Sequence, residues 1–295
     1  MIRIENLTKT FDGFTALDGL SLHVKQGSIY GMVGVNGAGK TTAIKHLAGL
    51  YRQESGDVSI DGAPVFDNAL LKSRVGYIPD ELYFFPFYTM RMQHNFLRRL
   101  YSPWGRWNEE RYGKMLALMG LDEKRRLGKF SKGMQKQAAF IFAMSAMPDV
   151  LLLDEPIDGL DPLVRKVVFE LIIEDVAQRG LTVLISSHNL KEMDGICDAV
   201  GIIKAGRMGI ERDLDDLKAD VHKIQVAFPV GEAGEFSLLG PDIQILHREK
   251  RGGVELLVVR GAHDLVEAKI KAMNPLLYDH LPLTLEEVFV YENLH

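Results

Sequence analysis

The sequence predicts an α/β fold with a mostly parallel central sheet, accompanied by an antiparallel β subdomain, a helical subdomain and a small C-terminal α+β extension. Almost continuously apolar runs at residues 29–33, 150–153 and 182–185 are typical of parallel strands that helices cover on both faces. Alternating apolar and polar residues near the start of the chain indicate half-exposed antiparallel strands. After about residue 220 the chain changes to short apolar runs separated by glycine-rich turns, which predict the extension.

The individual elements follow from the same patterns. The antiparallel strands are expected around residues 2–4, 20–24 and 57–62. The helix-rich segment covers roughly residues 90–147. In the extension we expect strands at residues 223–228, 243–247 and 254–259, and helices at residues 263–273 and 284–293. These elements group into two domains, residues 1–220 and residues 221–295.

Composition narrows the classes of function. A net charge of −5 over 295 residues shows no basic surplus, so we expect no nucleic-acid partner. The single cysteine, Cys197, cannot form an intrachain disulfide, which fits a reducing compartment. The first residues lack the layout of a signal peptide, and no apolar run approaches the roughly 18 to 20 residues that span a bilayer. We therefore expect a cytoplasmic protein that would meet a membrane by docking on another chain.

A glycine-rich loop connects the first buried strand to a helix. Residues 34–41 read G-V-N-G-A-G-K-T and match the phosphate-binding pattern G-x-x-x-x-G-K-[ST]. The glycines let backbone N–H groups converge on a polyphosphate, and the helix points its positive end at the same anion. Lys40 should reach the β and γ phosphates, and the Thr41 hydroxyl should ligate Mg²⁺. The residues expected to bind the nucleotide are Gly34, Asn36, Gly37, Ala38, Gly39, Lys40, Thr41 and Thr42. The alternative is a glycine-rich turn that binds nothing.

Two acids, Asp154 and Glu155, end the second buried strand. The carboxyl ends of parallel strands line ligand crevices. Asp154 is expected to hold Mg²⁺, usually through water, and Glu155 to orient and activate the attacking water as a general base. Two alternatives stay open: an acidic strand end that is solvated at the surface, and a Glu155 that acts only as a hydrogen-bond partner.

His188 follows the third buried strand, which we expect beside the strand of Asp154. From there its imidazole would meet the γ-phosphate, and the alternative is a structural histidine. The other eight histidines show no ligand spacing with the cysteine or with carboxylates. The sequence therefore predicts no metal site held by the protein alone, and Mg²⁺ only together with the nucleotide.

The most specific segment lies about 20 residues before Asp154. Residues 130–135 read F-S-K-G-M-Q and resemble the signature of the ATP-binding cassette (ABC) family, usually written L-S-G-G-Q. Ser131 suits a helix N-cap, and Gly133 permits close backbone approach to an anion. In isolation the segment would be an ordinary capped helix. In order with the loop and the two acids, it makes residues 1–215 similar to an ABC cassette, a P-loop NTPase fold.

This resemblance implies further roles. In the family, the signature faces the ATP held by the opposite subunit, so Ser131 and Gly133 are expected to contact ATP across a dimer of this chain with itself or with a related cassette. Phe11 stands where the family keeps an aromatic residue that stacks on adenine, although it could also be a core contact of the β region. Residues 159–161 resemble the loop that contacts the partner subunit, and His188 resembles the switch histidine.

The chain departs from the family pattern at three positions. The family typically has glutamine where this chain has Asp80. A carboxylate could approach Mg²⁺ but cannot donate a hydrogen bond when ionised, so the role of Asp80 as a metal ligand stays open. Lys132 and Met134 replace a glycine and a glutamine of the signature. Lys132 either adds positive charge near the γ-phosphate or projects into solvent.

A cluster of aromatic and methionine residues follows Asp80, between residues 83 and 92. In the family this region forms a groove for a short cytoplasmic helix of the membrane subunit, and the alternative is a local core of the helical insert. The signature variant and residues 283–289 resemble those of bacterial drug and antibiotic exporter ATPases. Both features favour export over import.

Taken together, these features predict the ATP-binding and ATP-hydrolysing subunit of an ABC transporter. It would lie peripherally on the inner face of the cell membrane, bound to integral membrane permease subunits. A first alternative is a soluble ABC ATPase that acts on nucleic acid or ribosomes, although such proteins generally need a coiled-coil insert or two cassettes in one chain. A second alternative is a GTPase or small-molecule kinase. The sequence lacks a guanine-reading N-K-x-D motif, and such proteins would not need the signature segment.

Overall fold

The computed structural model describes residues 1–214, 220–229, 236–284, 286–287 and 291. Contacts between residues divide the chain into two compact units, one of residues 1–189 and 195–211, the other of residues 190–194 and 212–295. The division into two domains at residue 220 stays a prediction.

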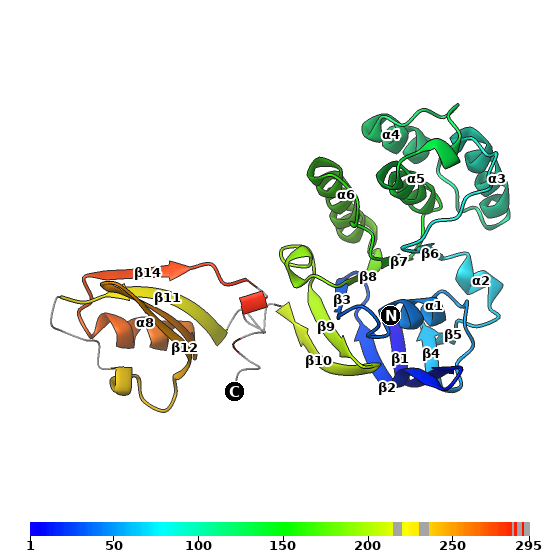
Figure 1. The fold of residues 1–295 in the computed structure, drawn as a ribbon. Helices are drawn as coiled ribbons and strands as arrows, with labels where there is room; N and C mark the ends of the chain where they lie inside the picture. Colours follow the sequence, from blue (N-terminus) through cyan, green and yellow to red (C-terminus); the bar gives the residue numbers. More distant parts are fainter. Residues whose placement is uncertain (215–219, 230–235, 285, 288–290, 292–295) are drawn as a thin grey trace. The chain divides into compact units, whose positions relative to one another are not determined.

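A six-stranded sheet in the order β10-β9-β3-β8-β7-β6 forms the centre of the first unit (Figure 1). The strands are β3 (Ile29–Val33), β6 (Val75–Ile78), β7 (Val150–Asp154), β8 (Thr182–Ser187), β9 (Ala199–Lys204) and β10 (Arg207–Asp213). All pairings among β3, β6, β7, β8 and β9 are parallel. Every residue of β3, β7 and β8 is buried, which explains their continuous apolar runs. The predicted parallel core is confirmed.

A four-stranded antiparallel sheet in the order β2-β1-β4-β5 accompanies it. Its strands are β1 (Ile2–Phe11), β2 (Phe14–Val24), β4 (Ser55–Ile60) and β5 (Ala63–Pro64). Helix α1 (Lys40–Leu47) contacts both this sheet and β7 of the parallel sheet. One apolar cluster joins both sheets to α1 through Ile4, Leu22, Ile44 and Leu152. The helix that begins at the glycine-rich loop is therefore held from two sides.

The helical subdomain is confirmed between β6 and β7. It consists of α3 (Met90–Tyr101), η1 (Ser102–Trp104), α4 (Glu109–Met119), η2 (Leu127–Lys129) and α5 (Lys132–Ser145). Thr89, Asn108 and Ser131 cap the three α-helices by accepting backbone N–H hydrogen bonds. Further helical elements lie outside this subdomain: α2 (Ala69–Lys72), α6 (Pro162–Arg179) and η3 (Leu190–Glu192). Helix α5 contacts both α4 and β6, so the insert is tied to the edge of the parallel sheet.

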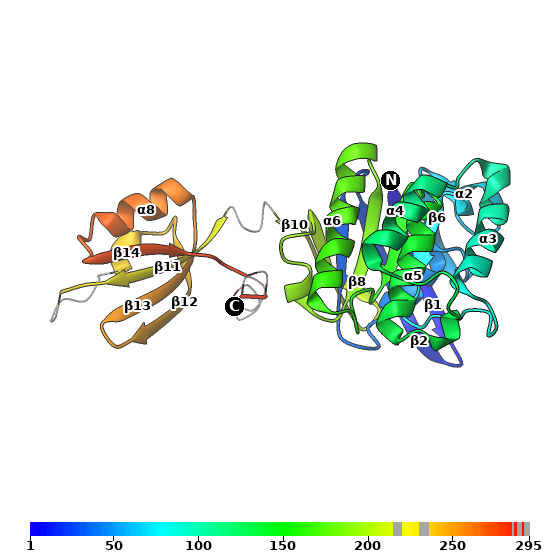
Figure 2. The same cartoon turned by 90° about the horizontal axis from the view of Figure 1, so that it is seen from above.

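The second unit is an antiparallel sheet in the order β12-β13-β11-β14 with a helix against one face (Figure 2). Its elements are β11 (Val221–Ala227), η4 (Phe236–Leu239), β12 (Gln244–Arg251), β13 (Val254–Arg260), α8 (His263–Lys271) and β14 (Leu277–Leu281). The predicted α+β character, the three strands and the first helix are confirmed. Of the helix expected over residues 284–293, residues 285, 288–290 and 292–293 lie outside the described part of the chain.

Strand β14 was not predicted from the sequence. Its residues read L-Y-D-H-L, and aspartate is depleted in strands. Its pairing with β11 along five residue positions supplies what the local sequence lacks. Among the described residues, no helix combines the length and the apolar character that crossing a membrane requires.

Candidate active site

The glycine-rich loop lies between β3 and α1, where the sequence predicts it. A Cβ atom at Gly34 would lie 2.5 Å from the carbonyl oxygen of Ile203 on β9. Gly39, the residue before α1, has a φ of +109°, and a Cβ there would lie 2.7 Å from the carbonyl oxygen of Ala16. Both positions therefore exclude side chains, because the loop is pressed against the neighbouring strands. The N–H groups at the start of α1 face the loop without side-chain obstruction.

Lys40 is the first residue of α1 and is buried, with 6% of its surface exposed. Its ammonium donates hydrogen bonds to the carbonyl oxygens of Gly34, at 2.7 Å, and of Val35, at 3.4 Å. The same Nζ lies 3.2 Å from Oε1 of Glu155 in an ion pair that lacks hydrogen-bond geometry. The loop thus positions a cation beside the carboxylate at the end of β7.

Asp154 is the last residue of β7 and is almost fully buried. Its Oδ1 accepts a hydrogen bond of 2.7 Å from the Ser186 hydroxyl on β8, the residue beside it in the sheet. Burial raises the pKa of Asp154, although the hydroxyls of Ser186 and Thr41 lower it in part. Within the described part of the chain, Oδ2 of Asp154 is buried and makes no hydrogen bond. A buried carboxylate oxygen without a donor fits the oxygen ligands that Mg²⁺ prefers.

The backbone of Glu155 is held from both sides in a left-handed conformation, with a φ of +46°. Its N–H donates a hydrogen bond of 3.1 Å to the Ser186 hydroxyl. Its carbonyl oxygen accepts a hydrogen bond of 2.6 Å from Nζ of Lys136, a buried residue of α5. This backbone conformation turns the side chain away from the strand direction, and both contacts stabilise it.

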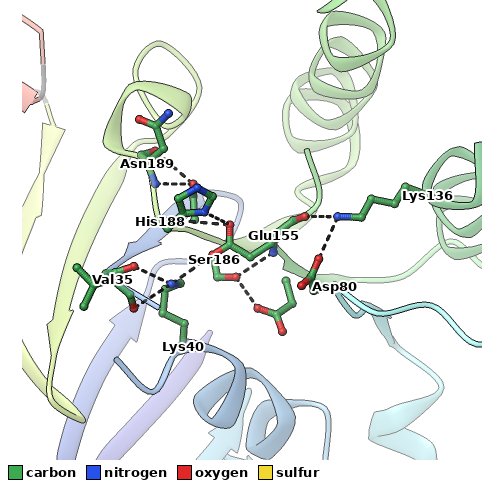
Figure 3. A network of polar contacts seen from close by, with 11 residues as sticks. Val35, Lys40, Asp80, Lys136, Glu155, Ser186, His188 and Asn189 are labelled. Carbon is green, nitrogen blue, oxygen red and sulfur yellow. Dashed lines mark hydrogen bonds and ion pairs between the residues drawn. The ribbon is translucent and has the colours of Figure 1, made fainter. Parts of the chain in front are cut away.

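The side chain of Glu155 lies between Lys40 and His188 (Figure 3). Its Oε2 lies 3.0 Å from Nδ1 of His188 and accepts a 3.3 Å hydrogen bond from the His188 backbone N–H. Because an ionised carboxylate only accepts hydrogen bonds, Nδ1 carries the ring proton here. His188 follows β8, and β8 pairs with β7, as the sequence predicts.

Asp80 pairs with Lys136, with 3.2 Å between Oδ1 and Nζ. Half of the Asp80 side chain is exposed, whereas Lys136 is buried. Lys136 therefore joins three segments: its own helix α5, the chain after β6 through Asp80, and the end of β7 through the Glu155 carbonyl (Figure 3).

A cavity of about 440 Å³ brings most of the predicted residues together. Its lining consists of Phe11, Phe14, Ala16, Asn36, Gly37, Ala38, Gly39, Lys40, Thr41, Thr42, Asp80, Glu155, Asp158 and His188. This lining includes the glycine-rich loop, three carboxylates, a histidine and two phenylalanines. It has the size and the chemistry of a site for a small phosphorylated ligand.

Ser131 and Gly133 do not line this cavity. Ser131 caps α5 by accepting a hydrogen bond of 3.2 Å from the Met134 N–H. A Cβ at Gly133 would lie 2.8 Å from the carbonyl oxygen of Gly159, so in this chain the glycine permits contact with the segment after Glu155. Lys132 is exposed.

Phe11 is not buried in the core of the antiparallel sheet. It is 37% exposed, lines the cavity and makes an edge-to-face contact with Tyr51 at 5.4 Å between ring centroids. The Nζ of Lys9 lies 5.1 Å from the Phe11 ring centroid. The ring therefore stands at the edge of the cavity, where an adenine would have to stack.

Three residues of the site were missed from the sequence. Ser186 connects Asp154 to the Glu155 backbone, and its position opposite Asp154 follows only from the pairing of β7 with β8. Lys136 stands one residue beyond the signature, and nothing local indicates that its ammonium reaches Glu155. Asp158 lines the cavity from the turn that follows Glu155, and its nearness to the two acids in the chain was the available signal.

Comparisons with known proteins agree with this geometry. The family model described as ABC transporter matches residues 17–158. The chain is 28% identical over 290 residues to the ABC transporter ATP-binding protein YtrB of Bacillus subtilis, covering 98% of this chain and 97% of YtrB. It is 31% identical over 297 residues to the Nod factor export ATP-binding protein I of Burkholderia thailandensis, covering 98% of this chain and 95% of that protein.

The fold comparison gives the same result. The solved structure of an ATP-binding subunit of an ABC transporter shares 27% identity with this chain at a TM-score of 0.67, covering 74% of this chain and 92% of the other. These relatives favour a transporter subunit over a cassette protein that acts on nucleic acid or ribosomes. A relative is more than 30% identical along nearly the whole of both chains, and the glycine-rich loop, Glu155 and His188 line one cavity. The chain therefore belongs to the ATP-binding subunits of the ABC transporter family.

Proposed function

We propose that this subunit hydrolyses ATP in the cavity between the glycine-rich loop and the ends of β7 and β8, and that it powers an exporter. One observation carries the proposal: Lys40, Glu155 and His188 reach one cavity from three separate segments, each with its polar atoms within hydrogen-bond or ion-pair distance of another. Phosphoryl transfer to water needs a loop that binds the phosphates and polar side chains that orient the attacking water. Here the carboxylate at the end of β7 contacts both the loop lysine and the histidine.

The contact between Lys40 and Glu155 suggests how the site changes when nucleotide enters. The β and γ phosphates would compete with Glu155 for the Lys40 ammonium, because both are anions within its reach. Glu155 would then be released to accept a proton from the attacking water. His188 lies 3.0 Å from Glu155, and its imidazole would be free to meet the γ-phosphate once the carboxylate has moved.

Asp154 and Thr41 would hold the Mg²⁺ that accompanies the nucleotide, through the Asp154 oxygen that lacks a hydrogen bond. When bound, this ion neutralises charge on the transferred phosphate. We assign Asp80 to positioning instead of metal binding, because one of its oxygens is engaged by Lys136.

A second cassette would complete the site. Ser131 and Gly133 lie at the positive end of α5 but outside the cavity of their own chain, so they would contact ATP only across a head-to-tail dimer. In such a dimer, the start of α1 from one chain and the start of α5 from the other would face the same ATP.

An apolar surface on the helical subdomain supports docking on membrane subunits. Its exposed side chains are Tyr83, Phe85, Phe87, Met92 and Phe96, and we call this set the aromatic surface. Phe85 packs on Tyr88 and Phe96 at centroid distances of 4.6 and 5.8 Å, which joins the loop to α3. Met90 is fully buried, so the cluster of residues 83–92 divides between core and surface. Exposed aromatic and methionine side chains mark an interaction site.

With this docking, the subunit would lie on the inner face of the cell membrane, bound to permease subunits. The similarity to the Nod factor export ATP-binding protein I supports export as the direction.

The nucleotide part is tested with Lys40→Ala. We expect ATP hydrolysis to fall at least a hundredfold, since the main cation for the phosphates is removed. Lys166→Ala is the matched control, because Lys166 is on α6 with 75% of its side chain exposed. Near-normal turnover of Lys40→Ala would contradict the assignment.

The docking part is tested with Phe87→Asp, which places a charge on the aromatic surface. We expect recovery with a membrane fraction to fall severalfold, while ATP binding serves as the test of folding. Leu118→Asp is the control, because Leu118 on α4 is also exposed and apolar but lies outside the aromatic surface. Equal membrane recovery of both variants would remove the aromatic surface from the proposal.

A further inference from the structure

Three histidines of the second unit come together from three elements. His222 is on β11, His263 is the first residue of α8, and His280 is on β14. The ring centroid of His222 lies 5.1 Å from that of His263 and 5.4 Å from that of His280. The ring centroids of His263 and His280 are 5.4 Å apart. One ring nitrogen from each histidine lies within 4.8 Å of the other two.

The fold explains why these rings share one place. In the antiparallel pairing of β11 with β14, His280 is opposite Ile224. His222 precedes Ile224 by two residues, so both histidines are on the face of the sheet where Ile224 packs against α8. His263 begins α8 and closes the group from the helix side.

We propose that His222, His263 and His280 form a binding site for one divalent transition-metal ion of the Zn²⁺ class. Three imidazole nitrogens on a tetrahedral Zn²⁺, at about 2.0 Å each, are separated by about 3.3 Å. The rings must therefore approach by at most about 1.5 Å from their present separation. Rotation of His263 and His280 supplies this movement, because both side chains are on the surface.

The hydrogen bond of His222 prepares it as a ligand. His222 is buried, and its Nε2 lies 3.0 Å from the carbonyl oxygen of Gly261. A carbonyl oxygen can only accept, so Nε2 carries the proton and the Nδ1 of the neutral ring keeps its lone pair. Histidines that bind metals are oriented in this way by a carbonyl or carboxylate on the other nitrogen.

A carboxylate stands beside the cluster. Oε2 of Glu267, one turn further along α8, lies 3.7 Å from Nε2 of His263. Oε1 of the same carboxylate pairs with Nζ of Lys271 at 2.5 Å, so Oε2 is the oxygen that faces the histidine. Carboxylates beside histidine ligands orient their rings. Three neutral imidazoles suit Zn²⁺, Ni²⁺ or Cu²⁺ and do not suit Mg²⁺, so the site is chemically separate from the nucleotide site. A bound ion would link β11, α8 and β14.

The sequence predicts no metal site held by the protein alone, whereas we propose one here. The spacing of the histidines along the chain explains this difference. The three histidines are far apart along the chain and belong to β11, α8 and β14, the last of which the sequence did not reveal. Metal-ligand spacing was therefore absent from the sequence, although the ligands are close in space.

The test is a Zn²⁺ titration of the full-length chain without a histidine tag, followed by calorimetry and by thermal unfolding. We expect saturation at one ion per chain with a dissociation constant on the order of 1 μM or below, and a higher unfolding temperature. Co²⁺ in place of Zn²⁺ should give the visible absorption of a tetrahedral site. His263→Gln and His280→Gln should each weaken binding at least tenfold. Both change exposed residues, so folding is preserved.

Two controls separate this site from others. His247→Gln changes a histidine of the same unit that stacks on Tyr291 at 4.8 Å, and its Zn²⁺ binding should equal that of the unchanged chain. The side chains of Glu155, Asp158 and His188 also offer ligand atoms close together, so His188→Ala should retain the tight ion. Absence of saturable binding, or tight binding that survives both His263→Gln and His280→Gln, would overturn the proposal.

Discussion

One aspartate directly precedes strand β7 and another ends it, and the two differ in burial, in partners and in the direction of their pKa shifts. At the amino end, Asp149 accepts hydrogen bonds from Arg74 at 2.6 Å and from Arg106 at 2.9 Å. Partial burial raises the pKa of Asp149, but the hydrogen bonds from the two arginines outweigh it, so the pKa is lowered. At the carboxyl end, Asp154 is more deeply buried, has no arginine, and has a raised pKa.

The difference is the one we expect between an acid that stabilises the fold and an acid that, as proposed, holds the metal ion of a ligand complex. The arginines at Asp149 come from the segment before β6 and from the helical subdomain, so this end connects parts of the fold. The carboxyl end concentrates an unpartnered oxygen on Asp154 and a left-handed backbone at Glu155. Such unfavourable features cluster at functional sites, where a ligand offsets their cost.

The largest effect is expected at the carboxyl end with Glu155→Gln. Glutamine has the same shape but cannot accept the proton of the attacking water, so hydrolysis should fall by roughly two to four orders of magnitude. ATP binding should remain, and MgATP should trap a dimer that solution mass measurements detect. Turnover close to that of the unchanged chain would assign Glu155 to hydrogen bonding alone.

A smaller effect is expected from Lys136→Met, which removes the cation from the Glu155 carbonyl. We expect turnover to fall roughly tenfold, with a much smaller change in the KM for ATP, because the backbone of Glu155 loses a positioning contact and the phosphate contacts stay. Lys136→Arg, which keeps the charge, should recover part of the loss. Lys166→Met is the control, since Lys166 on α6 is exposed and lies outside the site. A roughly tenfold rise in the KM for ATP with unchanged turnover would contradict the positioning role of Lys136.

The same substitution at both ends of β7 should change stability in opposite directions. Asp149→Asn should lower the free energy of unfolding by roughly 1 kcal/mol, a modest value because about a third of the side chain is exposed. Asp154→Asn should raise the unfolding temperature of the nucleotide-free chain, because the buried charge disappears. Thermal unfolding with EDTA measures both. Destabilisation by both variants would mean that Asp149 and Asp154 both stabilise the nucleotide-free fold, which would contradict the comparison.

The smallest effect is the pH dependence at Asp149. Because its pKa in the fold is lowered, its contribution to stability is fully present above its ordinary pKa of 3.8 and is lost as the pH falls through the lower value. The difference in unfolding temperature between Asp149→Asn and the unchanged chain should therefore be constant from pH 5 to 8 and shrink below pH 4. A difference that persists at pH 3 would assign the effect to packing.

What could be predicted from the sequence depends on how far apart the interacting residues are. The glycine-rich loop, Asp154 with Glu155, and the cap of α5 are local patterns, and the buried strands beside them are visible as continuous apolar runs. Lys136 and Ser186 act only through contacts that the folded chain creates, with the Glu155 carbonyl and with Asp154. Strand β14 depends on pairing with β11 and not on its own residues. The histidine cluster likewise depends on the pairing of β14 with β11 and on contacts that only the folded chain creates.

The close packing of Gly133 against Gly159 has a consequence for which substitutions the signature segment tolerates. An added methyl group at 133 would meet the Gly159 carbonyl oxygen at 2.8 Å and force the start of α5 away from the turn after Glu155. Lys132 projects outward, and Met134 takes part in the capping of the helix through its backbone N–H, which any residue but proline supplies. Positions 132 and 134 are therefore free to vary on either side of a sterically constrained glycine, so these two departures from the family pattern leave the cap of α5 in place.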